Sequence, residues 1–215
     1  VDLDAGALIK NSLIKLVSET HTPTVFSMPG FFAGGIDAPG SPDTLLMAST
    51  DSVGTKVRLA AAVGSFRGLG ADIVNHCVND ILTTGARPLF FLDYIGIDEA
   101  DERRIVEVVE GLRDACKVAN CAIIGGETAF LPGVYNTGDL DLVGFIVGIV
   151  AKDKLLNPRA TVQPGDTLIG VPSDGIHTNG ASLVRKVFNA DDDSSALNET
   201  PEGFSQTLGE TLITP

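Results

Sequence analysis

Residues 70–96 have the sequence GADIVNHCVNDILTTGARPLFFLDYIG, in which a helix signal is followed directly by a strand signal. In the first half, apolar residues recur at the spacing of one helix face, and Gly85 is a common type of C-terminal stop. The second half contains a compact apolar run at 89–95, which is typical of a buried strand. The stretch therefore predicts a helix over 71–84 that packs beside a strand.

Helix and strand signals continue along the rest of the chain. Helical spacing of apolar residues recurs in four further segments, namely 3–18, 57–63, 105–116 and 181–188. Short apolar runs predict further strands at 45–50, 121–124, 141–150 and 166–171. Asp98 is expected to cap the helix that contains 105–116. Because the two kinds of element alternate irregularly, we predict an α+β (mixed α/β) fold with mixed sheets rather than a doubly wound parallel sheet.

Two segments rich in proline and glycine interrupt this pattern. Residues 23–42 are predicted to form a long mobile loop, because so many Pro and Gly residues oppose a regular element. Residues 152–165 resemble a linker between domains. We therefore expect a first domain over 1–158 and the beginning of a second, truncated domain over 159–215.

The composition limits the kinds of function. With 44% hydrophobic and 20% charged residues among 215, the chain has the composition of a globular protein and not of a disordered one. Its net charge of −13 disfavours a general nucleic-acid-binding protein, because such proteins need clustered Lys and Arg. A nucleotide ligand is not excluded, since backbone N–H groups, one or two cations and Mg²⁺ are enough to hold a small phosphate group.

Cysteine content and apolar run length indicate the cellular setting. The chain has 3 cysteines at irregular spacing, which suggests neither a disulfide framework nor a thiolate zinc site. Its apolar runs are too short to cross a bilayer, and its N-terminal residues show no signal-peptide pattern. We therefore predict a cytoplasmic protein without membrane or nucleic-acid partners.

A first polar cluster follows the predicted strand at 45–50. Asp51, Gly54, Thr55 and Lys56 provide a carboxylate, a flexible position, a hydroxyl and a cation within six residues. The arrangement has the logic of a phosphate loop but lacks the GxxxxGK[ST] pattern. The alternative is a turn at a strand end with solvated charges.

A second cluster lies on the predicted helix 71–84. Its polar side chains are Asp72, Asn75, His76, Asn79 and Asp80. Asp and Asn are poor helix formers, and residues four apart share a helix face, so this grouping favours a binding function. Oxygen ligands favour Mg²⁺ over zinc. The alternatives are a solvated helix face and, for His76 alone, a core histidine with satisfied hydrogen bonds.

Two further clusters follow predicted strands. Gly125, Gly126, Glu127 and Thr128 come directly after 121–124, where paired glycines would let backbone N–H groups approach an anion and Glu127 could hold a cation. The alternative is a tight turn that requires positive φ.

The other cluster is SDGIHTNG at 173–180, between a predicted strand and a predicted helix, a position in which loops often carry function. Ser173, His177 and Asn179 are its candidate side chains for contact with substrate. Small and polar neighbours make a core packing role less suited to His177 than to His76.

Together these segments resemble one family, the phosphoribosylformylglycinamidine cyclo-ligases, or aminoimidazole ribonucleotide (AIR) synthetases, of purine biosynthesis. The motifs that carry the resemblance are STDSVGTKVRLA (49–60), the stretch 70–96, GGETAFLPGVY (125–135), DLVGFIVGIV (141–150), PSDGIHTNGASLVRKVF (172–188) and TLGETLITP (207–215). They cover nearly the whole chain. Single motifs are shared with formylglycinamide ribonucleotide synthase, selenophosphate synthetase and thiamine-phosphate kinase.

The resemblance implies an ATP-dependent ligase that closes the imidazole ring of formylglycinamidine ribonucleotide, giving AIR, ADP and phosphate. It implies Mg²⁺ on Asp51, Asp80 and Glu127. The residues implied for ATP binding are Asp51, Gly54, Thr55, Lys56, Asp80, Gly125, Gly126, Glu127 and Thr128. Ser173, His177 and Asn179 would bind substrate, with Lys56 and His177 as catalytic residues. The alternatives are a small-molecule kinase of the same superfamily and a non-catalytic, nucleotide-binding dimerisation fragment.

The resemblance also implies an architecture. The first domain would be PurM-like, with a four-stranded sheet that pairs with its twin in a homodimer and with ATP near that interface. Residues 29–35 would form a loop that closes over the nucleotide, although the sequence FFAGG at 31–35 departs from the GGFG-like run of the family. Ser52 replaces the commoner Gly of DGVGTK, which should be tolerated only where φ is not positive.

Overall fold

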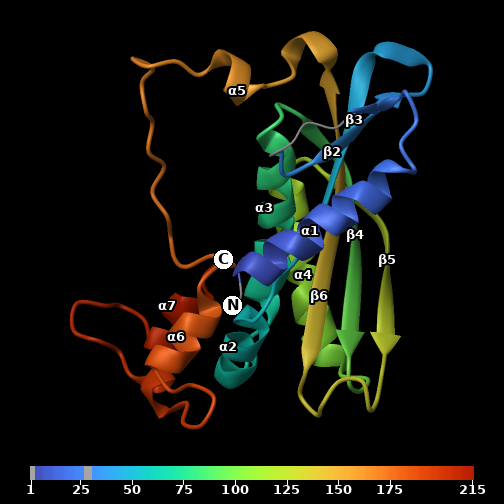
Figure 1. Cartoon of the computed structure of the whole chain (residues 1–215). Coiled ribbons are helices and arrows are strands. Elements are labelled where there is room, and N and C mark those ends of the chain that lie inside the picture. Colours follow the sequence, from blue (N-terminus) through green and yellow to red (C-terminus); the bar gives the residue numbers. More distant parts are fainter. Residues whose placement is uncertain (1–2, 27–30) are drawn as a thin grey trace.

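The computed structural model describes residues 3–26 and 31–215 (Figure 1). Its helices are α1 (Leu3–Ser18), α2 (Lys56–Val63), α3 (Arg67–Leu82), α4 (Glu102–Val118), α5 (Pro158–Thr161), α6 (Ala181–Val187) and α7 (Leu208–Ile213). Its strands are β1 (Val25–Phe26), β2 (Gly34–Ala38), β3 (Ser41–Ser52), β4 (Arg87–Ile97), β5 (Ala122–Phe130) and β6 (Leu140–Ala151). Two short 3₁₀ helices are η1 (Lys152–Lys154) and η2 (Ser195–Asn198).

The strands form one mixed sheet in the order β1-β2-β3-β6-β4-β5. Neighbouring strands are antiparallel except for β4 and β5, which are parallel and are connected through α4. This confirms the predicted mixed α and β fold. The expectation of four strands is wrong, because the described sheet has six.

The two additional strands come from the segment whose composition predicts a loop. Within residues 23–42, β1 and β2 form an antiparallel pair, and β2 continues the sheet through Ile36, which pairs with Leu46. Glycine and proline are weak strand formers, but pairing to an existing strand compensates for low propensity. Pro42 is the second residue of β3, and proline is tolerated at the start of a strand because few hydrogen bonds of the sheet depend on its missing N–H. Residues 27–30 lie outside the described residues, and with them the first two positions, 29 and 30, of the loop expected to close over the nucleotide.

Helix α3 packs on one face of the sheet, against β3 and β6 (Figure 1). We call this the inner face and the opposite one the outer face. Ile73, Cys77 and Ile81 of α3 are fully buried. Two glycines of β6 make this contact close, because a Cβ at Gly144 would lie 2.8 Å from Ile73 and one at Gly148 would lie 2.7 Å from Ile81. The predicted helix 71–84 is therefore confirmed, with an earlier start at Arg67.

Helices α3 and α4 approach each other closely at two more glycines. A Cβ at Gly70 would lie 2.1 Å from the carbonyl oxygen of Val108, and one at Gly111 would lie 1.9 Å from that of Arg67. Contacts this short exclude any side chain at either position without a shift of the helices. The glycines therefore fix how deeply α3 lies against α4.

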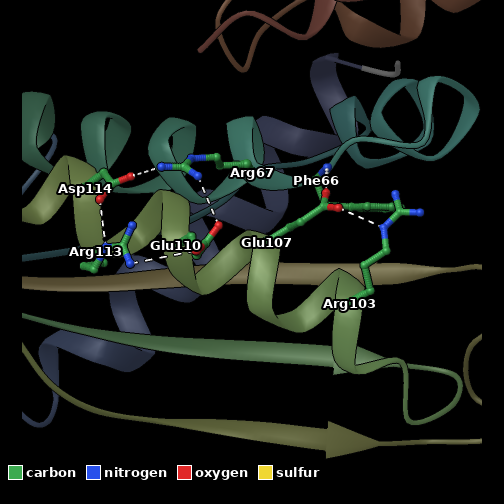
Figure 2. A network of polar contacts seen from close by, with 7 residues as sticks. All are labelled: Phe66, Arg67, Arg103, Glu107, Glu110, Arg113 and Asp114. Atoms are coloured by element: carbon green, nitrogen blue, oxygen red, sulfur yellow. Dashed lines mark hydrogen bonds and ion pairs between the residues drawn. The ribbon is translucent and has the colours of Figure 1, made fainter.

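A polar network joins the first turn of α3 to the exposed side of α4 (Figure 2). The Arg67 guanidinium contacts Glu110 at 3.0 Å and also Asp114. Glu107 accepts a hydrogen bond from the Phe66 backbone N–H at 2.9 Å. The ion pairs are solvent-exposed, so each contributes at most about 1 kcal/mol.

The N-terminal cap of α4 differs from the expected one. Asp101, not Asp98, accepts the capping hydrogen bond from the Arg104 N–H. Asp98 is instead buried and accepts hydrogen bonds from Gly138 N–H at 2.8 Å and from the Arg104 guanidinium. The Gly138 amide, helped by Arg104, holds the pKa of Asp98 below its usual value. Asp98 therefore ties the loop before β6 to the start of α4.

The residues after β6 form a second, smaller core. It joins α2, α6, η2 and α7 through five buried side chains: Leu59, Ala181, Ala190, Leu197 and Leu212. The predicted helix at 181–188 is confirmed as α6. The predicted strand at 166–171 is wrong: in the described part of the chain it pairs with no strand, and Leu168 is 97% exposed. Apolar composition favours an extended backbone but cannot supply the neighbouring strand that a ladder requires.

Among the described residues, no helix combines the length and the apolar character that a membrane span requires.

The close contact between α3 and α4 gives a testable prediction. We expect Gly111→Ala to lower the free energy of unfolding by about 3 kcal/mol, because its methyl group would collide with the Arg67 carbonyl oxygen and force the helices apart. Urea denaturation measures this change. The matched control is Gly34→Ala, whose Cβ would have no neighbour within 4 Å among the residues that the structure describes. Equal stability of the two variants would contradict the described packing.

Candidate functional site

Three side chains that could bind a metal ion meet where β3 ends beside α3. Asp51 belongs to β3, and His76 and Asp80 lie one turn apart on α3. One ligand atom from each lies within 4.8 Å of the others. The shortest separation is 2.9 Å, between His76 Nε2 and Asp51 Oδ2. Two carboxylates and an imidazole form a donor set that fits a divalent cation.

Each of these three side chains is held by a further hydrogen bond. Ser49 Oγ donates to Asp80 Oδ2 at 2.6 Å, and the Ser52 N–H donates to Asp51 Oδ1 at 2.7 Å. Thr178 Oγ1 lies 2.8 Å from His76 Nδ1, so the ring is oriented by a residue of the loop at 173–180. Such outer hydrogen bonds are typical of side chains that bind metal ions, because they fix the direction of the ligand atoms.

A cavity of about 460 Å³ opens beside this cluster, within the size range of small-molecule sites. One wall comes from α3 and the other from the loop at 173–180 and the last residue. The lining residues are Asp72, Asn75, His76, Val78, Asn79, Asp80, Asp174, His177, Thr178, Asn179 and Pro215. The structure thus brings together two of the sequence-predicted clusters, which lie about a hundred residues apart in the chain.

His177 lies in the cavity wall with an unusual backbone. Its φ is 51°, in the left-handed region that most non-glycine residues avoid. Its Nε2 lies 3.2 Å from Ser173 Oγ, whose hydroxyl also donates to the Gly175 carbonyl at 2.6 Å. Because that hydroxyl proton is used, Ser173 can accept from Nε2–H, and the tautomer with its proton on Nε2 has its lone pair on Nδ1. Asn179 lines the same cavity.

Lys56, predicted to contact phosphate, is fully buried. Its ammonium group lies 2.7 Å from Asp72 Oδ2 and donates to the Thr214 carbonyl at 2.8 Å. Burial raises the pKa of Asp72, and the hydrogen bond and charge of Lys56 oppose that rise. In this structure Lys56 therefore joins α2, α3 and the end of α7, and its ammonium group faces no open surface.

The other residues of the first cluster remain at the surface. Gly54 has a φ of 64°, so this position requires the freedom of glycine. Thr55 is exposed, with its hydroxyl 2.7 Å from Ser182 Oγ at the start of α6. Ser52 is absent from the described non-glycine residues with positive φ, which are Asn120, His177 and Asn189. The predicted condition for serine at position 52 is therefore met.

Residues 125–128 neither follow the strand, as expected from the prediction at 121–124, nor form a tight turn, because they lie inside β5. The sheet aligns Asp51 with Gly144, Gly144 with Asp93, and Asp93 with Gly126, so Gly126 lies three strands, or about 14 Å, from Asp51. A Cβ at Gly126 would lie 2.5 Å from Asp93 Oδ1, which gives this glycine a packing role. Burial raises the pKa of that aspartate.

Glu127 follows Gly126 and therefore points to the outer face, whereas Asp51 points to the inner face toward α3. It is exposed and pairs in register with Tyr94. Thr128, the next residue, is half-buried on the inner face. Within one chain, the structure thus separates Glu127 from the cluster of Asp51, His76 and Asp80.

Sequence reasoning missed several contacts of the site. It did not identify Asp72 as the partner of Lys56, nor Ser49, Thr178 and Asp174 as neighbours of the cluster and cavity. The helical spacing of Asp72, His76 and Asp80 was the available signal, since residues four apart share a face. Nothing in the local sequence indicates which distant segment that face meets.

Comparison with known proteins assigns the fold and the motifs to one family. The family model described as "AIR synthase related protein, N-terminal domain" matches residues 33–150, more than half of the chain. The matched region contains the cluster of Asp51, His76 and Asp80 together with the sheet that positions it. The chain therefore belongs to the AIR synthase related protein family.

Curated relatives extend this similarity over the whole chain. A phosphoribosylformylglycinamidine cyclo-ligase from Carboxydothermus hydrogenoformans is 42% identical over 100% of this chain and 63% of the relative. One of the same name from Gloeothece citriformis is 44% identical, with the same coverage. The chain thus spans about 63% of the length of these relatives.

Solved structures support the fold. The protein tt0281 from Thermus thermophilus superimposes with a TM-score of 0.55 at 22% identity, over 68% of this chain and 45% of that one. T. maritima PurL complexed with ATP gives a TM-score of 0.50 at 18% identity, over 66% of this chain and 24% of that one. At such identities the likeness concerns the fold alone.

The buried pair of Lys56 and Asp72 gives a second prediction. We expect Lys56→Met and Asp72→Asn each to lower the free energy of unfolding by about 3 kcal/mol, because each leaves one buried charge without its partner. The double variant should lose clearly less than the sum, since neither charge then remains. Urea denaturation of all four proteins measures the coupling. Lys154→Met, at an exposed position, is the control; a similar small loss at both lysines would rule out the described pair.

Proposed function

We propose that this chain provides the ATP- and substrate-binding part of a phosphoribosylformylglycinamidine cyclo-ligase. The observation that carries the proposal is the cavity in which the NHCVND face of α3 meets the SDGIHTNG loop, since both motifs line one space of about 460 Å³. The relatives that share 42–44% identity along the whole chain carry this name. A cytoplasmic location, which the sequence predicts, is part of the proposal.

The proposed reaction closes the imidazole ring of formylglycinamidine ribonucleotide. The formamide oxygen attacks the γ-phosphoryl group of ATP, and ADP leaves. An amidine nitrogen then forms a bond to the formyl carbon, the C–O bond breaks, and phosphate leaves with that oxygen. The amidine nitrogen and the formamide nitrogen each lose one proton, of which one stays on phosphate, and a proton shift from the ring CH₂ to the remaining imine nitrogen completes the imidazole. The products are AIR, ADP, phosphate and one proton. Such transfers depend mainly on positioning and charge neutralisation.

We propose that Asp51 and Asp80 hold the Mg²⁺ that accompanies ATP. When bound there, the ion would neutralise charge on the transferred phosphoryl group. His177 and Asn179 are proposed to face the substrate, with Nδ1 of His177 as the atom that accepts a proton. Ser173 would hold the His177 ring through the hydrogen bond to Nε2.

Two expected roles change in this proposal. Because the Lys56 ammonium is buried against Asp72 and Thr214, we propose that it acts by holding α7 at the edge of the cavity. Glu127 lies on the outer face, which suits a contact with nucleotide near a dimer interface better than a shared ion with Asp51. Gly125, Gly126 and Thr128 would accompany Glu127 in that contact, and Gly54 and Thr55 would approach ATP at the end of β3.

We propose that two chains form a homodimer through the outer faces of their sheets. This face carries an apolar hollow of about 480 Å³ whose walls include Ile36, Leu46, Ala48, Phe90 and Val147. Phe145 extends the apolar surface and is 38% exposed. Apolar patches of this kind on a sheet usually mark an interface between proteins. The division into a first domain at 1–158 and a second at 159–215 stays part of the proposal.

The ligase proposal is tested by product analysis with Mg²⁺–ATP and formylglycinamidine ribonucleotide. We expect AIR, ADP and phosphate in equal amounts, and a loss of at least about a hundredfold in ADP release for Asp80→Asn, which removes one charge from the metal site. The variant should keep its fold, because Ser49 can still donate to the amide oxygen. Asp153→Asn, at an exposed position of η1, is the control.

Two other outcomes would contradict the ligase proposal. A phosphorylated substrate without ring closure would indicate a kinase-like relative, and binding of ATP without release of ADP would indicate a non-catalytic module.

The dimer is tested by sedimentation equilibrium. We expect Phe145→Asp to weaken self-association by at least about a hundredfold, because a carboxylate would be buried in an apolar interface without a partner. Val106→Asp, at an exposed apolar position of α4, is the matched control and should leave association unchanged. A monomeric parent chain, or equal effects of the two substitutions, would refute this interface.

A further inference from the structure

We propose that His76 is a third metal ligand beside Asp51 and Asp80, and that their site binds a divalent transition-metal ion more tightly than Mg²⁺. This inference rests on the metal site of the proposed function and adds a ligand and a metal preference to it. The probe ion is Mn²⁺.

The spacing of the three ligand atoms suits a single octahedral ion. Neighbouring ligands of an octahedral ion with bonds of about 2.1 Å lie about 3.0 Å apart. His76 Nε2 and Asp51 Oδ2 are 2.9 Å apart, and an oxygen of Asp80 completes the group within 4.8 Å. Small side-chain rotations therefore suffice for all three atoms to contact one ion.

The imidazole ring of His76 is oriented as in a metal ligand. Thr178 Oγ1 is hydrogen-bonded to Nδ1 at 2.8 Å, which leaves Nε2 as the ring atom that faces the carboxylates. Histidine ligands in metal sites usually have their other ring nitrogen held in this way. Helix α3 is itself fixed by its glycine contacts with β6 and α4, so the ring starts from a rigid backbone.

The charges of the cluster favour a bound cation. Two carboxylates converge here, and Lys56 is engaged with Asp72 and Thr214. Among the residues that the structure describes, Asp80 has no cationic partner within ion-pair distance, and its carboxylate accepts a hydrogen bond from the Ser49 hydroxyl. A divalent ion would balance both carboxylates, whereas one imidazolium could balance only one.

The donor atoms of the cluster suit a transition-metal ion better than Mg²⁺. Mg²⁺ prefers oxygen ligands and gives up its water reluctantly, whereas imidazole nitrogen suits first-row transition metals. A site with one nitrogen and two carboxylate oxygens therefore discriminates in their favour. The rest of the coordination shell is open to the adjoining cavity, where water or a phosphate oxygen can bind.

The direct test is pulsed electron paramagnetic resonance of Mn²⁺ bound to the whole chain. We expect a nitrogen coupling from a directly bound imidazole, present in the parent protein and absent in His76→Ala. His21→Ala and His177→Ala remove the two other histidines and should keep the coupling. A parent protein without it, or its loss in His177→Ala alone, would overturn the proposal.

Calorimetric titration provides a second test. We expect Mn²⁺ to bind at least about tenfold more tightly than Mg²⁺, and His76→Ala to lower the Mn²⁺ affinity by at least about tenfold with less than about threefold effect on Mg²⁺. Thr178→Val should lower the Mn²⁺ affinity by about threefold to tenfold, because it frees the ring without removing the ligand. Equal losses for both ions in His76→Ala would indicate a structural role and refute the proposal.

Neither test uses turnover, so failures of the two proposals can be told apart. A nitrogen coupling from His76 in a protein that forms no AIR would support the metal ligand and refute the ligase. AIR formation in a protein without the nitrogen coupling would support the ligase and refute His76 as a metal ligand.

Discussion

The position of helix α3 is the constraint on which the rest of the molecule depends. Gly144 and Gly148 of β6 let its apolar face lie directly on the sheet, and Gly70 and Gly111 let α4 approach from the other side. Four close contacts leave the helix no freedom to rotate or slide, because any side chain at these glycines would collide with its neighbour. The polar residues on the adjacent face of α3 consequently lie beside the end of β3 and in the wall of the cavity. The geometry of the candidate site therefore follows from how α3 packs against the sheet and α4.

Much of the fold could be predicted because its signals are local. Helical spacing identified α3, α4 and α6, and the apolar runs identified the central strands, since both depend on residues that are close in the chain. The site cluster on α3 was visible for the same reason, as His76 and Asp80 share a face. Predictions failed where strand formation depends on pairing with another strand. Strands β1 and β2 form despite weak strand propensity, and residues 166–171 are unpaired despite strong strand propensity.

Other features could not be predicted because they depend on contacts between distant segments. Lys56 follows a strand end and has the sequence context of a phosphate ligand, yet Asp72 and Thr214 surround its ammonium group. Gly126 has the sequence context of an anion-binding turn, yet it accommodates Asp93. The face on which Glu127 lies follows from the register of β5, which a single strand sequence does not contain.

The strand order also constrains how the chain assembles. Strand β6 is the last of the six to be synthesised, yet it lies in the middle of the sheet, between β3 and β4. Until β6 has been synthesised, β1–β3 and β4–β5 are two separate half-sheets with open edges. The strand that pairs with β3 is synthesised on the order of a hundred residues after it. Such open edges are the usual sites of wrong pairing during folding. Strand β6, whose glycines contact α3, is therefore also the strand that joins the two half-sheets into one sheet.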